Sequence, residues 1–591
     1  MLPARASRAV ADRRIFFSEL KRRNVLRAGV VYVAATWALS QGISQLTPAL
    51  DLPDWATRAF LIACAIGFPI ALVLVWNFDS IWREIRQGLS AESPAPMATG
   101  AAVASKTEAP VEIPHKSIAV LPFVDLSPAR DQEYFSDGVA EEILNALVKL
   151  KDLKVAGRTS SFSFKGRNED LRNVGRMLSV AHVLEGSVRK HGDRVRITVQ
   201  LIQTCDGYHL WSEKFDGDLS DVFELQERIA RAIARELDVL LHGEQRLVPV
   251  ATTDPEAYAL YLEASSIYNR RDVAHLAQAA EMLTQAIALD PRFARAYSRL
   301  AAVHSLQSNS PGADMDVIVA TVMKEAAQAS VLDPRLGEPY TAIALACHHA
   351  HRFIEGRDAL EKAQKLQPDD AAVWYWSGTM LLMDGYTALA CQWLDRCLSL
   401  DPLYPAAMLW RGVGYLMAGD FNHAERLFEQ ARGAGLVHAW LSMHEITAAQ
   451  GRPREAAVQL ARGMVFLAAG LPKETLEVLA HGVYGDSVDR ARALALIEEF
   501  VATRPALLPG AIPYALLLMG ETTRALDLGR RCCSANDVLY YHRLWMPAMR
   551  SARGSPQFHA FARDTGLVAL WDRYGPPDGA RRDAVGEYVW E

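Results

Sequence analysis

The chain has 591 residues, half of them hydrophobic and 22% charged, which is ordinary for folded protein and too long for a single hydrophobic core. Its formal net charge of −6 gives no sign of the basic surface that nucleic-acid-binding proteins carry. The seven cysteines show no CxxC pair and no zinc-ligand spacing, which excludes a disulfide framework and a zinc-ribbon type of site.

Two apolar stretches follow the basic segment 1–27. Residues 59–78 carry no charged side chain, and about 20 such residues are enough to cross the roughly 30 Å hydrocarbon core of a bilayer. Residues 28–46 are also uncharged but include two serines and two glutamines. We predict a transmembrane hairpin over residues 28–78, and an amphipathic helix lying in the membrane interface is the alternative for the first stretch.

The distribution of basic residues predicts the orientation of this hairpin. Residues 1–27 carry eight Lys or Arg against two acidic residues, and Arg83 and Arg86 follow the second stretch. The positive-inside bias then places both outer ends, and the bulk of the chain, in the cytoplasm. If only residues 59–78 span the membrane, the bulk lies on the opposite side. The length of the basic region makes a cleaved signal peptide the weaker interpretation.

Residues 79–114 form a linker, because their second half is rich in Ala, Ser, Pro and Thr. Residues 115–242 show the pattern of an α/β domain, with a hairpin signal at Gly192–Asp193. Ser136 or Asp137 is the predicted N-cap of its first helix. The predicted elements are strands at 117–123, 153–158, 181–192, 193–207 and 208–216, and helices at 136–150, 168–180 and 221–241.

These residues carry a resemblance to a known family. "SIAVLPF", "YFSDGVAEEILNAL", "VLEGSVRKHGDRVRITVQLIQTCDGYHLWSEKFD" and "DVFELQERIA" resemble the TolB amino-terminal-like domain of bacterial membrane proteins, which typically precedes tetratricopeptide repeats. The opening "FFSELKRRNVLRAGVVYVAATWALSQ" is similar to the membrane anchor of the same multidomain family. Some relatives carry a cyclase or a winged-helix module. Only 27 residues precede the first apolar stretch here, so we expect neither activity.

The α/β domain could hold a ligand at one end of its sheet. "RTSS" (158–161) and "SFKGR" (163–167) offer polar groups near a strand end, where α/β sheets often bind ligands. A solvated loop is the favoured interpretation of both segments. The chain has no GxxxxGK[ST] loop and no GxGxxG after a strand, so nucleotide binding has no support in the sequence.

A period of 34 residues runs through the second half of the chain, where Pro334, Pro368 and Pro402 each end a similar four-residue segment. This period is typical of tetratricopeptide repeats, which stack helix pairs into a solenoid with an open groove. We predict such an all-α solenoid over residues 250–591, with degenerate carboxy-terminal repeats. Its signature residues are Tyr340, Ala344, Ala363, Pro368, Trp374, Gly378, Ala390, Leu394, Pro402, Gly412, Tyr415, Ala424, Phe428 and Ala431.

Candidate chemical sites are few. Cys347 and His351 have the i, i+4 spacing of metal ligands, but a packed thiol with a nearby surface histidine is the favoured interpretation. "HEITA" at His444 lacks the second histidine of a metalloprotease motif. Cys532 and Cys533, and the set Trp374, Trp376 and Trp393, are interpreted as core residues. We therefore expect no catalytic residue, no cofactor and no metal.

The sequence predicts a non-catalytic, multi-pass membrane protein, and the family resemblance implies that the membrane is the bacterial inner membrane. Its repeat groove, lined by first-helix residues, would bind partner proteins and no nucleic acid. The alternative is a signalling sensor in which the α/β domain binds a small molecule and regulates the interactions of the repeats. The sensor hypothesis predicts a pocket with convergent polar groups within residues 115–242.

Overall fold

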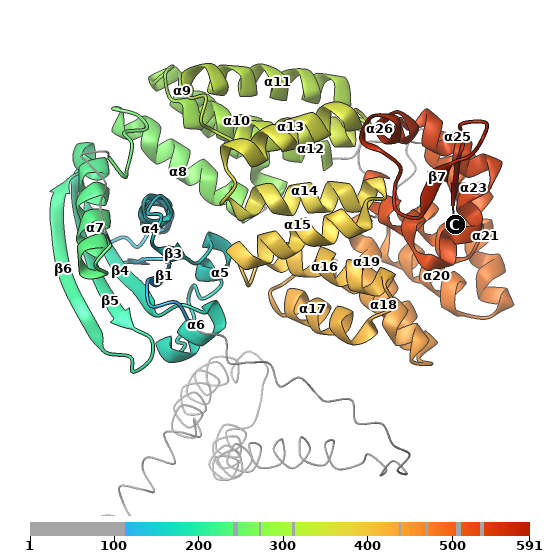
Figure 1. The fold of residues 1–591 in the computed structure, drawn as a ribbon, viewed down its shortest axis with the longest axis horizontal. Coiled ribbons are helices and arrows are strands. Elements are labelled where there is room, and N and C mark those ends of the chain that lie inside the picture. Colours follow the sequence, from blue (N-terminus) through green and yellow to red (C-terminus); the bar gives the residue numbers. More distant parts are fainter. Residues whose placement is uncertain are drawn as a thin grey trace, which may run out of the picture. The chain divides into compact units, whose positions relative to one another are not determined.

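The computed structural model describes residues 113–239, 246–270, 273–309, 314–436, 439–467, 471–503, 510–531 and 537–590. The predicted basic segment, both apolar stretches and residues 79–112 of the linker lie outside this range. Within it, no helix is both long and apolar enough to cross a membrane. Residues 109–591 form one compact unit, in which an α/β domain is followed by a long array of helices (Figure 1).

One mixed sheet forms the centre of the α/β domain. β1 is parallel to β3 and β4, whereas β4, β5 and β6 are antiparallel neighbours, and β2 pairs with β4. The hairpin predicted at Gly192–Asp193 is confirmed, and Gly192 has the positive φ (59°) that this turn requires. The strands are β1 (Ser117–Val120), β2 (Val124–Asp125), β3 (Lys154–Val155), β4 (His182–His191), β5 (Arg194–Gln203) and β6 (His209–Asp218).

Four helices complete the domain: α4 (Glu133–Val148), α5 (Arg158–Phe162), α6 (Leu171–Leu178) and α7 (Val222–Glu236). The prediction that Ser136 or Asp137 caps the first helix is wrong, because α4 begins three residues earlier. The Asp125 carboxylate accepts a hydrogen bond from the Gln132 amide (2.8 Å) and fixes the start of the helix. Ser136 is fully buried and donates to the Gln132 carbonyl (3.2 Å).

The array consists of helix pairs, each with a first and a second helix that pack together. In Figure 1 the pairs follow one another from α8 beside the α/β domain to α23. The described pairs are α8 (Pro255–Asn269) with α9 (Leu276–Leu289), α10 (Ala294–Leu306) with α11 (Met315–Leu332), α12 (Glu338–His349) with α13 (Phe353–Leu366), α14 (Ala371–Asp384) with α15 (Thr387–Leu400), α16 (Pro405–Met417) with α17 (Phe421–Gly433), α18 (Trp440–Ala449) with α19 (Pro453–Met464), α20 (Lys473–Tyr484) with α21 (Ser487–Thr503), and α22 (Ala511–Leu518) with α23 (Thr522–Arg531).

Small residues of the 34-residue pattern lie where two helices of a pair touch. A Cβ added to Gly378 would lie 2.7 Å from Leu394 Cγ and 3.1 Å from the Ala390 carbonyl oxygen. A Cβ added to Gly412 would lie 2.6 Å from Phe428 Cε1. The pattern therefore specifies how closely the first and second helices approach.

Gly412→Val should destabilise the array by roughly 1–3 kcal/mol, because the added side chain overpacks the contact with Phe428. Gly433→Ala is the matched control. Gly433 ends the partner helix α17 and has open space around it, so alanine there should be neutral or slightly stabilising. Denaturant unfolding of the full chain measures both effects, and equal midpoints for the two variants would contradict the packing.

The chain ends in a closing segment, residues 537–590, that folds back onto the array. It contains the 3₁₀ helices η6 (Asp537–Trp545) and η7 (Pro547–Met549), then α24 (Arg550–Arg553), α25 (Pro556–Asp564), α26 (Leu567–Tyr574), β7 (Ala580–Arg582) and β8 (Tyr588–Trp590). η6 packs against α12 and α14, and α26 packs against α13. The indole nitrogens of Trp545 and Trp571 donate to the carbonyls of Met383 (2.8 Å) and Asp384 (3.0 Å) at the end of α14.

The closing segment also reaches the first helices of later pairs. His542 makes an edge contact with Trp410 of α16 (5.3 Å between ring centroids), and Arg543 pairs with Glu445 of α18 and lies over the ring of Tyr514 of α22. We expected first-helix residues to line an open groove. In the structure the first helices α12, α14, α16, α18 and α22 instead contact the chain's own closing segment.

Candidate functional site between the α/β domain and the first repeats

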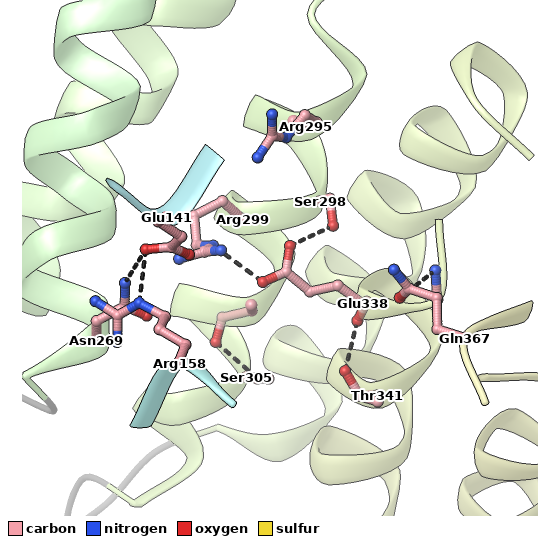
Figure 2. Close-up of polar contacts among 12 residues, drawn as sticks. Glu141, Arg158, Asn269, Arg295, Ser298, Arg299, Ser305, Glu338, Thr341 and Gln367 are labelled. Carbon is pink, nitrogen blue, oxygen red and sulfur yellow. Dashed lines mark hydrogen bonds and ion pairs between the residues drawn. The ribbon is translucent and has the colours of Figure 1, made fainter. Parts of the chain in front are cut away.

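Two adjacent carboxylates of α4 face the array. Glu141 Oε2 accepts hydrogen bonds from Arg158 Nε (2.7 Å) and Asn269 Nδ2 (3.4 Å), as Figure 2 shows. Glu142, whose side chain is 6% exposed, pairs with Arg295 (2.5 Å). Arg158 belongs to α5, Asn269 ends α8 and Arg295 lies on α10. One turn of α4 therefore contacts side chains of three other helices.

The polar network continues from α10 to the start of α12. Arg299, with a 10% exposed side chain, pairs with Glu338 (3.0 Å), and the Ser298 hydroxyl donates to the same carboxylate (2.7 Å; Figure 2). The Arg299 guanidinium also lies over the rings of Tyr261 and Tyr268, at 5.9 and 4.7 Å from their centroids. The arginine therefore connects the first three helix pairs.

The charges of this network shift the pKa of Glu141. Burial by itself would raise the pKa, but the positive charges of Arg158 and Arg299 outweigh it and the pKa is lowered. The carboxylate is therefore ionised at neutral pH. This network was not predicted from the sequence. The available signal was Arg295 and Arg299, two cations four residues apart on one face of a repeat helix.

Asp370 lies close to the same charges, but its pKa is shifted in the opposite direction from that of Glu141. Its carboxylate caps α14 by accepting from the Ala372 amide (2.8 Å), and burial, with Glu338 contributing, raises its pKa from 3.8 to about 6. A folded-state pKa above the unfolded value means that the folded chain keeps a proton which the unfolded chain releases. The stability that this carboxyl contributes is therefore fully present below pH 3.8 and is lost as the pH rises to about 6.

Asp370→Asn should remove this pH dependence while keeping a capping acceptor. We expect the variant to be more stable than the wild type above pH 6, by roughly 1–2 kcal/mol, and to lose that advantage at pH 4. Thermal unfolding between pH 4 and pH 8 measures the difference. The exposed neighbour Asp369 provides the control Asp369→Asn, and an identical pH profile for the two variants would contradict the assignment.

The short helix α5 joins the α/β domain to a distant repeat. Its first amides, of Thr159 and Ser160, donate to the carboxylate of Asp401 at 3.0 and 2.8 Å, and the Ser160 hydroxyl accepts from the Leu403 amide (2.6 Å). Asp401 follows α15 and is 2% exposed. A Cβ on Gly157 would overlap the Asp401 side chain, so this position requires glycine.

These contacts of α5 show that the prediction of a solvated loop for "RTSS" (158–161) is wrong. Ser160 and Ser161 are fully buried, and the segment is a helix whose amino-terminal end holds a carboxylate of the array. The prediction of a solvated loop fits the next segment, "SFKGR" (163–167), better, because residues 165–167 are exposed. Lys165 in that segment pairs with Glu133 (2.8 Å) and Asp137 (2.5 Å) of α4.

A cavity of about 360 Å³ opens beside the network, between α4, α5 and α8. The sensor hypothesis placed a polar pocket within residues 115–242, but α8 supplies a large part of this wall. Only a chain that contains both the α/β domain and the first repeat has the complete cavity. Its lining residues are Glu133, Tyr134, Asp137, Gly138, Glu141, Glu142, Arg158, Phe162, Lys165, Tyr261, Leu262, Ser265, Ser266, Asn269 and Arg270.

The structure places the predicted repeat signature in two environments. The small and apolar members are buried between helices: Ala344, Ala363, Gly378, Ala390, Leu394, Gly412, Ala424, Phe428 and Ala431. The remaining members are partly or largely exposed: Tyr340, Pro368, Trp374, Pro402 and Tyr415. The exposed aromatic rings contact polar groups: Lys362 lies over Tyr340 and Arg411 over Tyr415, and the Trp374 indole donates to the Pro368 carbonyl.

Cys347 is fully buried, which confirms the packed thiol, whereas His351 is only partly exposed and its neighbours His348 and His349 are buried. His348 and His349 are each 4% exposed, and His348 Nε2 lies 3.0 Å from Asp384 Oδ1. His351 stacks on Tyr541 of the closing segment, and burial lowers its pKa to about 4. Burial raises the pKa of the Cys347 thiol to about 11. These side chains hold neighbouring parts of the fold together and form no shared ligand set.

The other candidates are also structural. His444 is buried, with Nδ1 2.5 Å from the Tyr484 hydroxyl, and burial lowers its pKa well below the usual value. The rings of Trp374 and Trp393 pack edge to face, with centroids 6.0 Å apart, and both side chains are partly buried against the core. Cys532 and Cys533 lie outside the described residues. Among the described residues, no group of three or more metal-ligating side chains comes together.

Comparison with known proteins gives one family model over residues 114–232, the second domain of HilA/YgeH-like transcriptional regulators. This description differs from the TolB amino-terminal-like domain that the sequence resembles. The chain is 39% identical over 199 residues to putative adenylate cyclase 3 of Rhizobium meliloti, which is 33% of this chain and 34% of the relative. It is 23% identical over 363 residues to the transcriptional regulator HilA of Salmonella typhimurium, which is 60% of this chain and 64% of the relative.

The chain thus spans about one third of the length of the first curated relative and just under two thirds of the second. Among solved structures, YrrB, described as a TPR protein with an unusual peptide-binding site, aligns at a TM-score of 0.24 and 20% identity, over 34% of this chain and 98% of YrrB. The repeat assignment rests on the helix pairs and on the buried small residues in the 34-residue register, and not on this alignment. The chain contains tetratricopeptide repeats.

Proposed function

We propose that the protein is a non-catalytic, membrane-anchored scaffold that binds partner proteins through its helical array. The observation that carries this proposal is the array itself: helix pairs from α8 to α23, joined to the α/β domain through Asp401 and Arg295. Repeat arrays of this kind offer extended surfaces for other chains. The name of the cyclase-like relative gives no reason to add an enzyme activity, because the match covers one third of each chain.

The partner surface that we propose differs from a first-helix groove. The first helices α12, α14, α16, α18 and α22 contact the closing segment, whereas the second helices α11 and α21 keep exposed apolar residues, Val331 (76% exposed) and Val488 (72%). We therefore place partner docking on the second helices α11 and α21, because α13 and α23 pack against α26 and α25 of the closing segment.

A photo-crosslinking amino acid at single exposed positions of the full chain, expressed in bacterial membranes, provides a direct test. We expect the array positions 331 and 488 to give defined adducts with other proteins. The matched control is Val124 on β2 of the α/β domain, which is 58% exposed. Adducts from position 124 alone, or no adduct from either array position, would overturn the proposal.

The anchor belongs to the same proposal. Residues 28–46 and 59–78 would form a hairpin in the bacterial inner membrane, with the α/β domain, which we also propose to be TolB-like, and the array in the cytoplasm. Reporter enzymes fused after Glu591 separate the possibilities. Activity of a cytoplasmic reporter is the expected result, whereas activity only of a reporter that works outside the cytoplasm would overturn the hairpin.

A sensor is the second candidate function. The cavity between α4, α5 and α8 favours it, because charged groups of both the α/β domain and the array line one space. The family model over residues 114–232 is named for transcriptional regulators, which is compatible with a regulatory role for this domain. In this hypothesis a ligand in the cavity would alter how the array presents its surface.

A further inference from the structure

Charged side chains line the cavity between α4, α5 and α8, and most of them are already paired within the protein. Glu141 pairs with Arg158 (2.7 Å), Lys165 with both Glu133 (2.8 Å) and Asp137 (2.5 Å), and Glu142 with Arg295 (2.5 Å). A ligand that carries an ammonium group would have to compete with the protein's own cations for these carboxylates. Among the described carboxylates of the wall, only Asp137 Oδ1 is buried without a hydrogen-bond partner, and the other oxygen of that carboxylate already holds Lys165.

Arg270 at the end of α8 is different. Its Nη1 donates to the Ser266 hydroxyl (3.2 Å), and among the described residues no carboxylate pairs with it. Arg158 on the opposite wall uses Nε for Glu141, and no acceptor from the described part of the chain takes a hydrogen bond from its two terminal nitrogens. Two guanidinium groups from different elements therefore border the same cavity. Guanidinium groups bind carboxylates and phosphates through paired hydrogen bonds.

Three of the fifteen residues that line the cavity are aromatic. Tyr134 of α4, Phe162 of α5 and Tyr261 of α8 all border the cavity. The Arg158 guanidinium lies over the Phe162 ring at 4.3 Å from its centroid, and Tyr261 is 4% exposed. Flat aromatic surfaces beside a guanidinium favour a ligand with a planar apolar part next to its charged group.

We propose that this cavity binds a small molecule that combines a planar apolar part with a carboxylate or phosphate group, held by Arg270 and Arg158. The site needs α5 and α8 together, so it belongs to the full chain and not to the isolated α/β domain. The inference gives the sensor hypothesis a ligand class. It does not depend on the scaffold role, because ligand binding and partner crosslinking are separate measurements.

The position of α5 gives this site a consequence for the array. Arg158 and Phe162 of α5 border the cavity, while the amides of Thr159 and Ser160 in the same short helix hold Asp401 of the array. A ligand bound by Arg158 therefore contacts α5, the helix that holds the α/β domain to the array at Asp401, just after α15. Reduced amide exchange at Thr159 and Ser160 on ligand binding is the expected signature.

Binding of phenyl phosphate, benzoate and benzylamine to the purified full chain tests the proposal by ligand-observed NMR titration. We expect both anions to bind saturably with dissociation constants on the order of 1 mM, and benzylamine to bind at least about tenfold more weakly. A preference between the two anions identifies the charged group as phosphate or carboxylate.

Arg270→Gln should weaken binding of both anions about three- to tenfold, without a change in melting temperature, because Arg270 belongs to no buried network. The matched control is Arg292→Gln, which removes an exposed arginine of the array outside the cavity lining and should leave binding unchanged. Benzylamine binding as tight as that of the anions, equal effects of the two substitutions, or no saturable anion binding would overturn the proposal.

Discussion

Arg543→Ala should destabilise the array by roughly 3–5 kcal/mol, the largest effect that we expect from a single substitution here. The Arg543 side chain is 4% exposed, pairs with Glu445 of α18, and lies over Tyr514 of α22 at 5.0 Å from the ring centroid. Alanine removes the packing and leaves a carboxylate without its partner in a mostly buried position, which is the costly way to break an ion pair. Denaturant unfolding followed by tryptophan fluorescence measures the loss.

Two further variants separate the ion pair from a general effect of the substitution. Arg550→Ala replaces an exposed arginine of the same closing segment and should change stability by less than about 0.5 kcal/mol. Arg543→Met combined with Glu445→Leu removes both charges and should recover part of the stability, because no unpaired charge remains. Equal destabilisation by Arg543→Ala and Arg550→Ala would show that the closing segment is not part of the core.

Asp401→Ala should loosen the α/β domain from the array and cost roughly 2–4 kcal/mol. The substitution leaves the buried amide of Ser160 and the partly buried amide of Thr159 without an acceptor, and a charged acceptor at a helix start is worth more than a neutral one. We expect the amides of residues 159–163 to exchange faster while those of β4 and β5 keep their rates. Hydrogen–deuterium exchange on the full chain resolves the two regions.

The control for this joint is Asp369→Ala, which removes an exposed aspartate that pairs with Arg396 at 3.2 Å. Such a surface pair contributes little, so exchange at residues 159–163 should not change. Gly157→Val approaches the same joint from the other side, because its side chain would overlap Asp401. If Asp401→Ala leaves the exchange of α5 unaltered, the domain is not held to the array through this carboxylate.

Local patterns were sufficient for much of the fold. Gly192–Asp193 predicted the hairpin, the alternation of Val195, Ile197, Val199 and Leu201 predicted the buried face of β5, and the 34-residue register predicted the helix pairs. Each of these signals is carried by residues close together or equally spaced in the sequence. Such periodicity reflects which face of an element is buried.

The candidate site was not predictable in the same way. Asp401 and Ser160 are 241 residues apart, and no periodic signal marks a single carboxylate that caps a helix in another domain. The prediction of degenerate repeats up to residue 591 does not include a segment that folds back, whereas Tyr541, Leu544 and Trp545 are buried and η6 packs against α12 and α14. Contacts of this range depend on how the array curves as a whole, which the spacing of repeat residues does not encode.

Amide hydrogen exchange of the full chain without any partner tests the central claim most directly. The claim is that the closing segment covers first helices of the array and that α5 fixes the α/β domain to it. We predict that the amides of residues 541–546 and 159–163 exchange as slowly as those of α14. Exchange of these two segments within seconds, with α14 still protected, would contradict the account and leave the first-helix groove open to partners.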